Sequence, residues 1–274
     1  MAGHRRWRHR LPPGWRLWPL LFIWLGLALP AVAGPPAAPD SSPHLVLNSP
    51  FSAPITSPAG DGFLDLLYAE LFKRLGISFE IQLLPGERAL SNANAGIDDG
   101  DVCRIAGLSA RYPNLVRSRE PVLAYRMTVF SAGPEFEVDG PASLRPYRLG
   151  ILSGWKILEE TTADHPRRLA LEETDQLFLM LAAGRLDLAL IDRLLGREAI
   201  ARLGLAGIKE LRPPLLTGNW YLYLHRRHRQ LLPAIDRELR RLKEDGSYQR
   251  IRRQTLGDFE AGAAPPAVGM EGGT

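Results

Sequence analysis

A short pattern occurs twice in this chain, and it constrains the fold more than any other feature of the sequence. In the first copy a predicted helix ends at Ala95-Gly96 and leads through Ile97-Asp98 into a strand. In the second copy a helix ends at Ala183-Gly184 and leads through Leu186-Asp187 into a strand. Glycine suits both helix ends because the left-handed turn there disfavours a Cβ atom, and the acidic residue that follows starts the strand. The repetition predicts two similar halves.

The segment before the first copy shows the same alternation of helix and strand. Leu45-Val46-Leu47 predicts a short buried strand, apolar residues from Leu64 to Leu75 recur at helical spacing, and Phe79 to Leu83 alternates like a second strand. A strand, helix and strand in this order form the unit of a parallel sheet with a right-handed crossover. We therefore predict an α/β fold with two lobes, each a mainly parallel sheet flanked by helices.

Stretches rich in proline and glycine mark the expected boundaries. Two of them, 132–146 and 212–218, are predicted to carry the chain between the lobes as two hinge crossings. We expect a signal peptide at 1–33 and a flexible linker at 34–43. The first lobe then comprises 44–131 and 218–257, the second lobe comprises 132–217, and a disordered tail follows at 258–274.

The first 33 residues are typical of an export signal. Five arginines precede an apolar run from Leu17 to Leu29, which ends in the small-residue cleavage site Ala31-Val32-Ala33. The run is shorter than the roughly 20 apolar residues of a spanning helix, and Pro19 interrupts it, so cleavage is favoured over a permanent anchor. We expect a soluble mature protein in the periplasm, one that does not span the membrane.

Removal of this leader changes the charge balance. It holds five of the 34 basic residues and none of the 30 acidic ones, which leaves 29 against 30. A nearly neutral chain does not support nucleic-acid binding. The one cysteine, Cys103, cannot form an internal disulfide, and its apolar neighbours indicate an inert buried thiol. The basic run 225–229 lacks the further ligands that a metal needs. No metal or cofactor is expected, and the absence of common catalytic motifs argues against an enzyme.

Three motifs together resemble the family 3 periplasmic solute-binding proteins, which commonly serve amino-acid importers. They are Gly62-Phe63-Leu64-Asp65-Leu66 leading to Lys73-Arg74-Leu75-Gly76, Gly184-Arg185-Leu186-Asp187 leading to Asp192, and Glu244-Asp245-Gly246-Ser247 leading to Ile251. The resemblance covers Leu45 to about Gly257, and it implies a type II periplasmic-binding fold whose lobes close on a ligand by hinge motion.

The resemblance also implies a function. We expect a monomer that captures a small polar or anionic molecule in the cleft between the lobes and serves an ABC importer through its inner-membrane permease. Two alternatives stay open. The protein can be a sensory module that reports to a membrane receptor, or a dehydratase-like enzyme on the same fold.

One departure from the family concerns the ligand's carboxylate, which an arginine of a Ser/Thr-x-x-Arg element usually holds. Aligning Glu120-Pro121 with the family's acidic-proline pair places Ser109 at the hydroxyl position and Tyr112 at the arginine position. Arg104 or Arg88 could supply the charge from another wall. Arg104 is the stronger candidate because it interrupts an apolar strand, where a charge needs a ligand or an internal partner, Asp101 or Glu120.

The remaining site candidates each have a structural alternative. Phe51 can stack on the ligand or plug its own loop. Ser153, Gly154 and Trp155 follow a predicted strand and can point backbone N–H groups at an anion, or form a plain turn. Asp192 resembles the family's acidic residue for a ligand amino group, or pairs with a nearby arginine. Trp220 can line the hinge or belong to the core, and Arg88 can simply pair at the surface.

Overall fold

The structure is a computed structural model that describes residues 43–261. The predicted signal peptide, nearly all of the predicted linker and residues 262–274 lie outside the described residues. Within 43–261, no helix has both the length and the apolar character that a membrane crossing requires.

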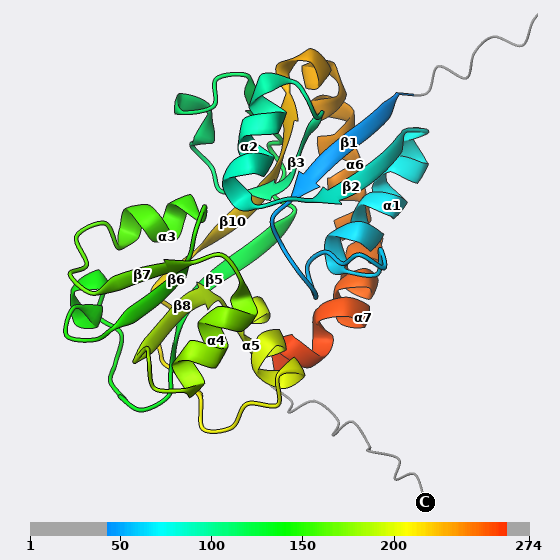
Figure 1. Ribbon diagram of the computed structural model, residues 1–274. Coiled ribbons are helices and arrows are strands. Elements are labelled where there is room, and N and C mark those ends of the chain that lie inside the picture. Colours follow the sequence, from blue (N-terminus) through cyan, green and yellow to red (C-terminus); the bar gives the residue numbers. More distant parts are fainter. Residues whose placement is uncertain (1–42, 262–274) are drawn as a thin grey trace, which may run out of the picture. The chain divides into compact units, whose positions relative to one another are not determined.

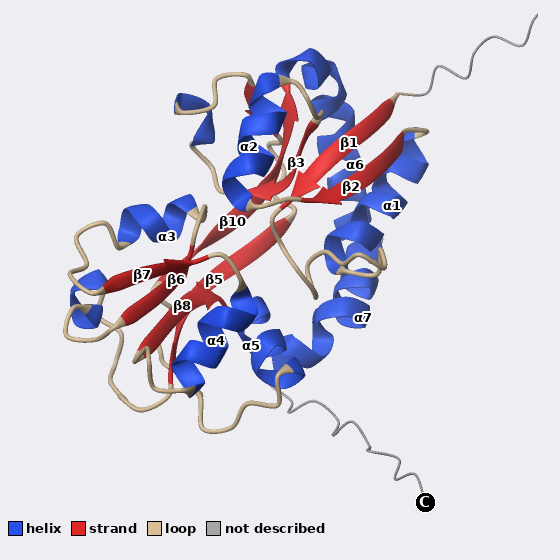
Figure 2. Cartoon of the chain, in the orientation of Figure 1, coloured by secondary structure: helices blue, strands red, loops and turns tan. Residues whose placement is uncertain are grey.

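The centre of the fold is a mixed sheet of ten strands in the order β2-β1-β3-β10-β5-β8-β6-β7, with β4 paired to β10 and β9 paired to β5 (Figures 1 and 2). The strands are β1 His44–Ser49, β2 Ser78–Leu83, β3 Gly100–Arg104, β4 Leu115–Arg117, β5 Leu123–Ser131, β6 Leu149–Leu152, β7 Arg168–Leu171, β8 Leu188–Asp192, β9 Lys209–Glu210 and β10 Leu216–His225. The pairs β1 with β2 and β3, and β6 with β7 and β8, are parallel, as the alternation of helices and strands predicts.

Helices cover the sheet in two groups. They are α1 Phe63–Leu75, α2 Gly86–Ala95, α3 Lys156–Thr161, α4 Thr174–Ala182, α5 Arg193–Arg202, α6 Leu232–Glu244 and α7 Ser247–Ala261. In the first lobe α2 packs on β1 and β3, and α1 packs against α6; in the second, α3 and α4 pack on β6, and α5 on β8 and β5. The predicted two-lobed α/β fold is confirmed.

Two long antiparallel strands connect the lobes. Leu216–Trp220 of β10 pairs with β5, while Tyr221–His225 pairs with β3 and β4. Strand β5 pairs first with β10 and then with β8. The stretch 132–146 follows β5, and the stretch 212–218 leads into β10, where residues 216–218 already pair with β5. The lobe boundaries stay a prediction, because a strand shared by both lobes does not mark where one rigid body ends.

The repeated pattern has a physical basis in both lobes. Gly96 and Gly184 end their helices at φ 74° and φ 66°, the left-handed region that glycine favours. Three residues later, Asp99 accepts a hydrogen bond from the backbone N–H of Val46, and Asp187 accepts one from that of Arg148. Asp99 rather than Asp98 is therefore the counterpart of Asp187, and each carboxylate ties its strand to the neighbouring parallel strand.

The last helix is longer than predicted, so the predicted tail begins too early. Helix α7 continues to Ala261, four residues beyond the expected end of structure at Gly257. Leu256 is fully buried, Phe259 packs against the core, and Arg197 of α5 donates hydrogen bonds to the carbonyls of Phe259 and Glu260. These contacts stabilise the helix beyond Gly257, where the low helix propensity of glycine suggests an end.

Candidate functional site

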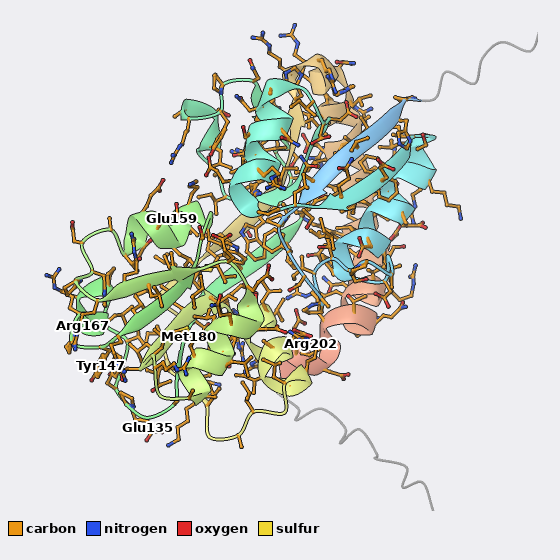
Figure 3. The ribbon with its side chains drawn as sticks, in the orientation of Figure 1. Glu135, Tyr147, Glu159, Arg167, Met180 and Arg202 are labelled. Carbon is orange, nitrogen blue, oxygen red and sulfur yellow. The ribbon has the colours of Figure 1, made fainter. Side chains whose placement is uncertain are left out.

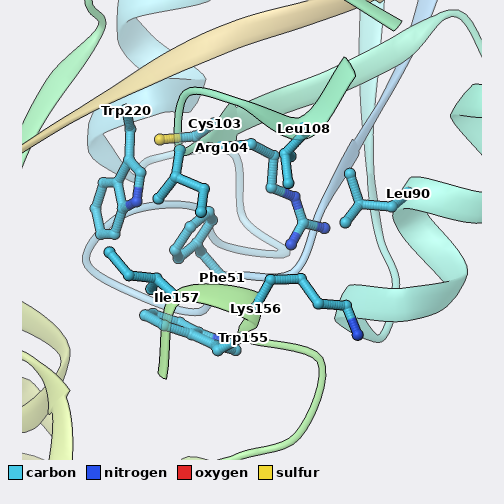
Figure 4. A pocket seen from close by; sticks show the side chains of 10 residues that line it. Phe51, Leu90, Cys103, Arg104, Leu108, Trp155, Lys156, Ile157 and Trp220 are labelled. Atoms are coloured by element: carbon cyan, nitrogen blue, oxygen red, sulfur yellow. The ribbon is translucent and has the colours of Figure 1, made fainter. Parts of the chain in front are cut away.

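The two lobes meet around a small cavity, here called the aromatic cavity. Its ten lining residues come from both lobes and from β10: Phe51, Leu90, Cys103, Arg104, Ile105, Leu108, Trp155, Lys156, Ile157 and Trp220 (Figure 4). The cavity measures about 30 Å³, which is room for one or two water molecules. Pockets for small molecules typically measure roughly 300–1,000 Å³. The described conformation is therefore closed, and a larger ligand requires the lobes to separate.

Three aromatic rings form one wall of this cavity. Phe51 lies between two tryptophans, with its ring centroid 5.3 Å from that of Trp155 at 74° and 4.9 Å from that of Trp220 at 55° (Figure 4). These edge and tilted geometries are favourable for aromatic pairs. Since Phe51 follows β1, Trp155 precedes α3 and Trp220 lies on β10, the rings connect both lobes with the strand between them.

A bulge in β3 places a charged pair beside the rings. Tyr221 pairs with Arg104 and Tyr223 with Asp101, so two steps along β10 match three steps along β3. An extra residue reverses the alternation of side chains, which brings Asp101 and Arg104 to the same face although they are three residues apart. Arg104 Nη2 lies 2.8 Å from Asp101 Oδ2. The bulge therefore makes Asp101 the internal partner of Arg104.

Arg104 retains hydrogen-bonding capacity despite this pair. Its side chain is 8% exposed, and Nη2 also donates to the carbonyl oxygen of Gly86 at 3.0 Å. Its Nε is buried without a partner. Burial raises the pKa of Asp101, and the neighbouring guanidinium offsets only part of that rise. The pair is therefore costly, and one buried donor of Arg104, Nε, lacks an acceptor in the described structure.

A second set of contacts joins the lobes next to the cavity. Lys156 Nζ lies 2.5 Å from Glu87 Oε2 on α2 and 3.0 Å from Glu159 Oε2 on its own helix α3. Figure 3 labels Glu159 on that helix. The Tyr112 hydroxyl donates to Glu87 Oε1 at 2.9 Å. Hydrogen bonds from Lys156 and Tyr112 hold the pKa of Glu87 below its usual value, because their effect is larger than the opposing effect of burial.

Two glycines allow the backbones of the lobes to touch at this point. A Cβ atom on Gly154 would lie 3.0 Å from the backbone nitrogen of Glu87, and one on Gly86 would lie 3.1 Å from the carbonyl oxygen of Gly154. Gly154 also has φ 75°. A Cβ atom at either position would require the facing backbone to move by a few tenths of an ångström, which disfavours the close approach of the lobes.

Beside the aromatic cavity lies a larger one of about 340 Å³, here called the neighbouring cavity. It shares Phe51 and Trp155 with the aromatic cavity, and it opens at the carboxyl ends of β1, β2 and β6. Ligands of open α/β sheets commonly bind at such strand ends. The carboxylates of Glu172 and Glu173 line it from solvent-exposed positions.

The structure brings four of the predicted site residues together. Phe51, Arg104, Trp155 and Trp220 all line the aromatic cavity. Ser153 lines only the neighbouring cavity, and its backbone N–H donates to the carbonyl of Leu171.

The backbone of the expected anion-binding turn is already engaged. The N–H of Gly154 donates to Glu159 Oε1 at 2.7 Å, so an internal carboxylate occupies that donor. Two of the three amide groups of this turn, those of Ser153 and Gly154, therefore already have acceptors.

Four other predicted residues lie elsewhere. Arg88 is exposed on α2 and lines neither cavity. The Ser109 hydroxyl donates to the carbonyl of Leu115, and Tyr112 is buried with its hydroxyl on Glu87. Asp192 caps α5 by accepting the N–H of Leu194, and it also accepts the N–H of Arg126. Asp192 lines a separate cavity with Arg126, Arg193 and Glu260.

Sequence reasoning missed Lys156 and the cavity-lining role of Cys103. Lys156 directly follows the Ser153-Gly154-Trp155 turn, so its position at a helix start beside a predicted site was the available signal. The thiol of Cys103 is fully buried, as predicted, and burial raises its pKa well above its usual value.

Comparisons with known proteins support the fold. No protein-family model matches the chain. An uncharacterized protein of Shewanella oneidensis is 26% identical over 209 residues, which cover 72% of this chain and 76% of that protein. A histidine kinase sensor domain with similarity to periplasmic binding proteins superimposes with a TM-score of 0.70 at 18% identity, over 80% of this chain and 98% of that one.

An ancestral arginine-binding protein bound to arginine gives a TM-score of 0.66 at 18% identity, over 78% of this chain and 98% of that one. At these identities the likeness concerns the fold. The chain has the two-lobed fold of periplasmic binding proteins, as its sequence motifs predict.

Proposed function

We propose that this chain is an exported solute-binding protein, which captures a small polar or anionic molecule between its two lobes. Arg104 carries the proposal. A guanidinium that is almost buried and keeps an unpartnered Nε is costly unless an acceptor completes it. It lies beside three aromatic rings, in a cavity to which both lobes contribute. A ligand acceptor at this point would complete the hydrogen bonding and connect the lobes.

The arrangement of the strands supports capture by closure. Only β5 and β10 of the described strands run from one half of the sheet to the other, so a modest change in their backbone angles can move the lobes as units. The aromatic cavity is too small for a solute in the closed form. Binding in this cavity therefore requires the lobes to open, and they then close around the ligand less fully than in the described conformation.

A thermal-shift screen of the protein purified from cells that express the full chain tests this proposal. The screen covers amino acids, organic acids, polyamines and sugars. A ligand at a hundred times its Kd stabilises the folded state by about 2.7 kcal/mol, which raises Tm by roughly 5–10 °C for a chain of this size. Calorimetric titration then gives the stoichiometry. The proposal predicts one site per chain, and a screen with no ligand in any class would contradict it.

Export and delivery to a membrane partner belong to the same proposal. Mass spectrometry of the protein from the periplasmic fraction should show an N-terminus at Gly34. An intact N-terminus in the membrane fraction would contradict export.

Transport and sensing differ in the partner. The likeness to a histidine kinase sensor domain supports the sensory alternative to an ABC importer. Cross-linking in living cells should join the liganded protein to an importer permease on the first alternative and to a receptor with a signalling domain on the second.

A further inference from the structure

The charges around the aromatic cavity point to the chemistry of its ligand. Two of its ten lining side chains are cationic, Arg104 from the first lobe and Lys156 from the second, and none is acidic. Figure 4 shows the Arg104 guanidinium directed toward the side chain of Lys156. Both side chains are largely withdrawn from solvent, at 8% and 10% exposure. Such a cavity attracts an anionic group and disfavours a cation.

The nearby carboxylates are already engaged with these cations. Asp101 is fully buried against Arg104, and Glu87 and Glu159 pair with Lys156. Only one of these three pairs joins the two lobes, because Glu87 lies in the first lobe and Lys156 in the second. Separation of the lobes therefore frees Lys156 from Glu87 but leaves Arg104 with Asp101. A ligand carboxylate can take the place of Glu87 on Lys156 and accept from the unpartnered Nε of Arg104.

None of the described carboxylates lines this cavity to receive a ligand ammonium, and Glu87, which separation of the lobes frees from Lys156, is 54% exposed, so water screens its charge. Asp192 was the expected residue for that role, but its oxygens accept the N–H groups of Leu194 and Arg126, and it lines a different cavity. Glu172 and Glu173 line the neighbouring cavity from exposed positions, where water screens a charge pair. An ammonium group would therefore be desolvated beside two cations without a counter-charge.

The rest of the lining suits an apolar body. Phe51, Trp155 and Trp220 provide ring faces and edges, and the other side chains are apolar except for the Cys103 thiol. Aromatic and aliphatic groups gain from burial against such a surface.

We propose that the ligand is a small carboxylate with an apolar or aromatic body and no ammonium group, held by Arg104 and Lys156 from opposite lobes. This inference rests on the proposed solute-binding function. It predicts discrimination against 2-amino acids that share the same body, by about tenfold or more in affinity, because their ammonium group loses water without gaining a partner.

Calorimetric titration with matched pairs tests the inference. The pairs are propanoate and L-alanine, 4-methylpentanoate and L-leucine, and 3-phenylpropanoate and L-phenylalanine. We expect at least one carboxylate to bind, and its amino acid to bind at least about tenfold more weakly. An amino acid that binds as tightly as its partner or more tightly overturns the inference but upholds the proposed function, as does binding of a sugar or polyamine alone. Absence of binding by every compound overturns both.

A variant identifies the cavity as the site. Lys156→Met should weaken carboxylate binding by about tenfold or more, because one of the two cations is lost. The matched control is Lys209→Met, which removes an exposed lysine paired with Glu135 in the second lobe and should leave affinity unchanged. Equal affinities in both variants would place the carboxylate elsewhere and overturn the assignment to Lys156. Unchanged melting curves in the absence of ligand exclude misfolding as the cause of any loss.

Discussion

The two lobes use the same position in their repeat for opposite charges. Arg104 lies eight residues after Gly96, at the end of β3, and Asp192 lies eight residues after Gly184, at the end of β8. Arg104 lines the aromatic cavity, whereas Asp192 is buried at the start of α5 and lines another cavity.

The segment after each strand explains the difference. Strand β3 is bulged and leads into the loop Ile105–Gly107, so no helix start requires the Arg104 side chain. Helix α5 begins directly after Asp192, whose carboxylate accepts the orphan N–H of Leu194 as an N-cap. Equivalent positions in a repeat can therefore differ in role, because the next element decides whether the side chain is free to meet a ligand.

The largest expected effect comes from breaking the charge pair of the first lobe, Asp101 with Arg104. Asp101→Ala leaves Arg104 buried without its partner, which should lower the free energy of unfolding by about 3–5 kcal/mol. Asp187→Ala removes a partly exposed pair with Arg148 in the second lobe, together with the hydrogen bond from the Arg148 backbone N–H, and should cost about 1–2 kcal/mol. Denaturant unfolding measures both. The double variant Asp101→Ala/Arg104→Met should recover most of the loss, and a loss that persists in it would mean that Asp101 acts through something other than Arg104.

The next effect concerns the buried carboxylate of the second lobe. Burial raises the pKa of Asp192 from 3.8 to about 6. Between these values the folded chain holds a proton that the unfolded chain releases, so stability falls as pH rises from about 4 to about 6, by up to about 3 kcal/mol. Asp192→Asn keeps one cap acceptor and should flatten this part of the stability curve. Parallel curves for the wild type and the variant would contradict the raised pKa.

A smaller effect tests how closely the lobes approach. Gly154→Ala and Gly184→Ala both place a Cβ atom on a residue with positive φ, at a cost of about 1–2 kcal/mol. Only Gly154→Ala also brings that atom against the backbone of the other lobe.

Cys103 lines the aromatic cavity and is the one cysteine of the chain, so its reaction with a thiol reagent reports opening. Labelling of Gly154→Ala should be roughly tenfold faster, which corresponds to about 1.4 kcal/mol against closure. Similar acceleration in Gly184→Ala would show that backbone strain alone causes it.

The smallest effect comes from the ion pair between the lobes. Glu87→Gln removes the charge that Lys156 meets across the interface, and since Glu87 is 54% exposed the loss should stay below about 1 kcal/mol. Cys103 labelling should then accelerate by less than about fivefold. Glu135→Gln, which removes an exposed pair with Lys209 away from the interface, should leave labelling unchanged. If both variants label alike, the Glu87 contact does not hold the lobes together.

The lobes and most elements were predictable from sequence because they depend on local signals. Apolar spacing predicts α1, whose Leu64, Leu67 and Leu71 are fully buried, and glycines at helix ends predict the repeat. The bulge in β3 was not predictable, since no residue type marks the extra position and simple alternation places Asp101 and Arg104 on opposite faces. Lys156 and Glu87 look like ordinary surface charges until closure brings two distant segments together.

Helix α7 connects the lobes at a third place. Its first turn packs on α1 through Tyr248 and Phe63, while Arg197 of α5 holds the carbonyls of Phe259 and Glu260 at its other end. In mechanical terms the joint is braced on one side. Helices α2 and α3 lie on the opposite side of β5 and β10 from α7 (Figure 1). If the lobes rotate about an axis near α7, the side of the molecule that carries α7 moves little and the side that carries α2 and α3 moves most. A solute should therefore enter and leave between α2 and α3.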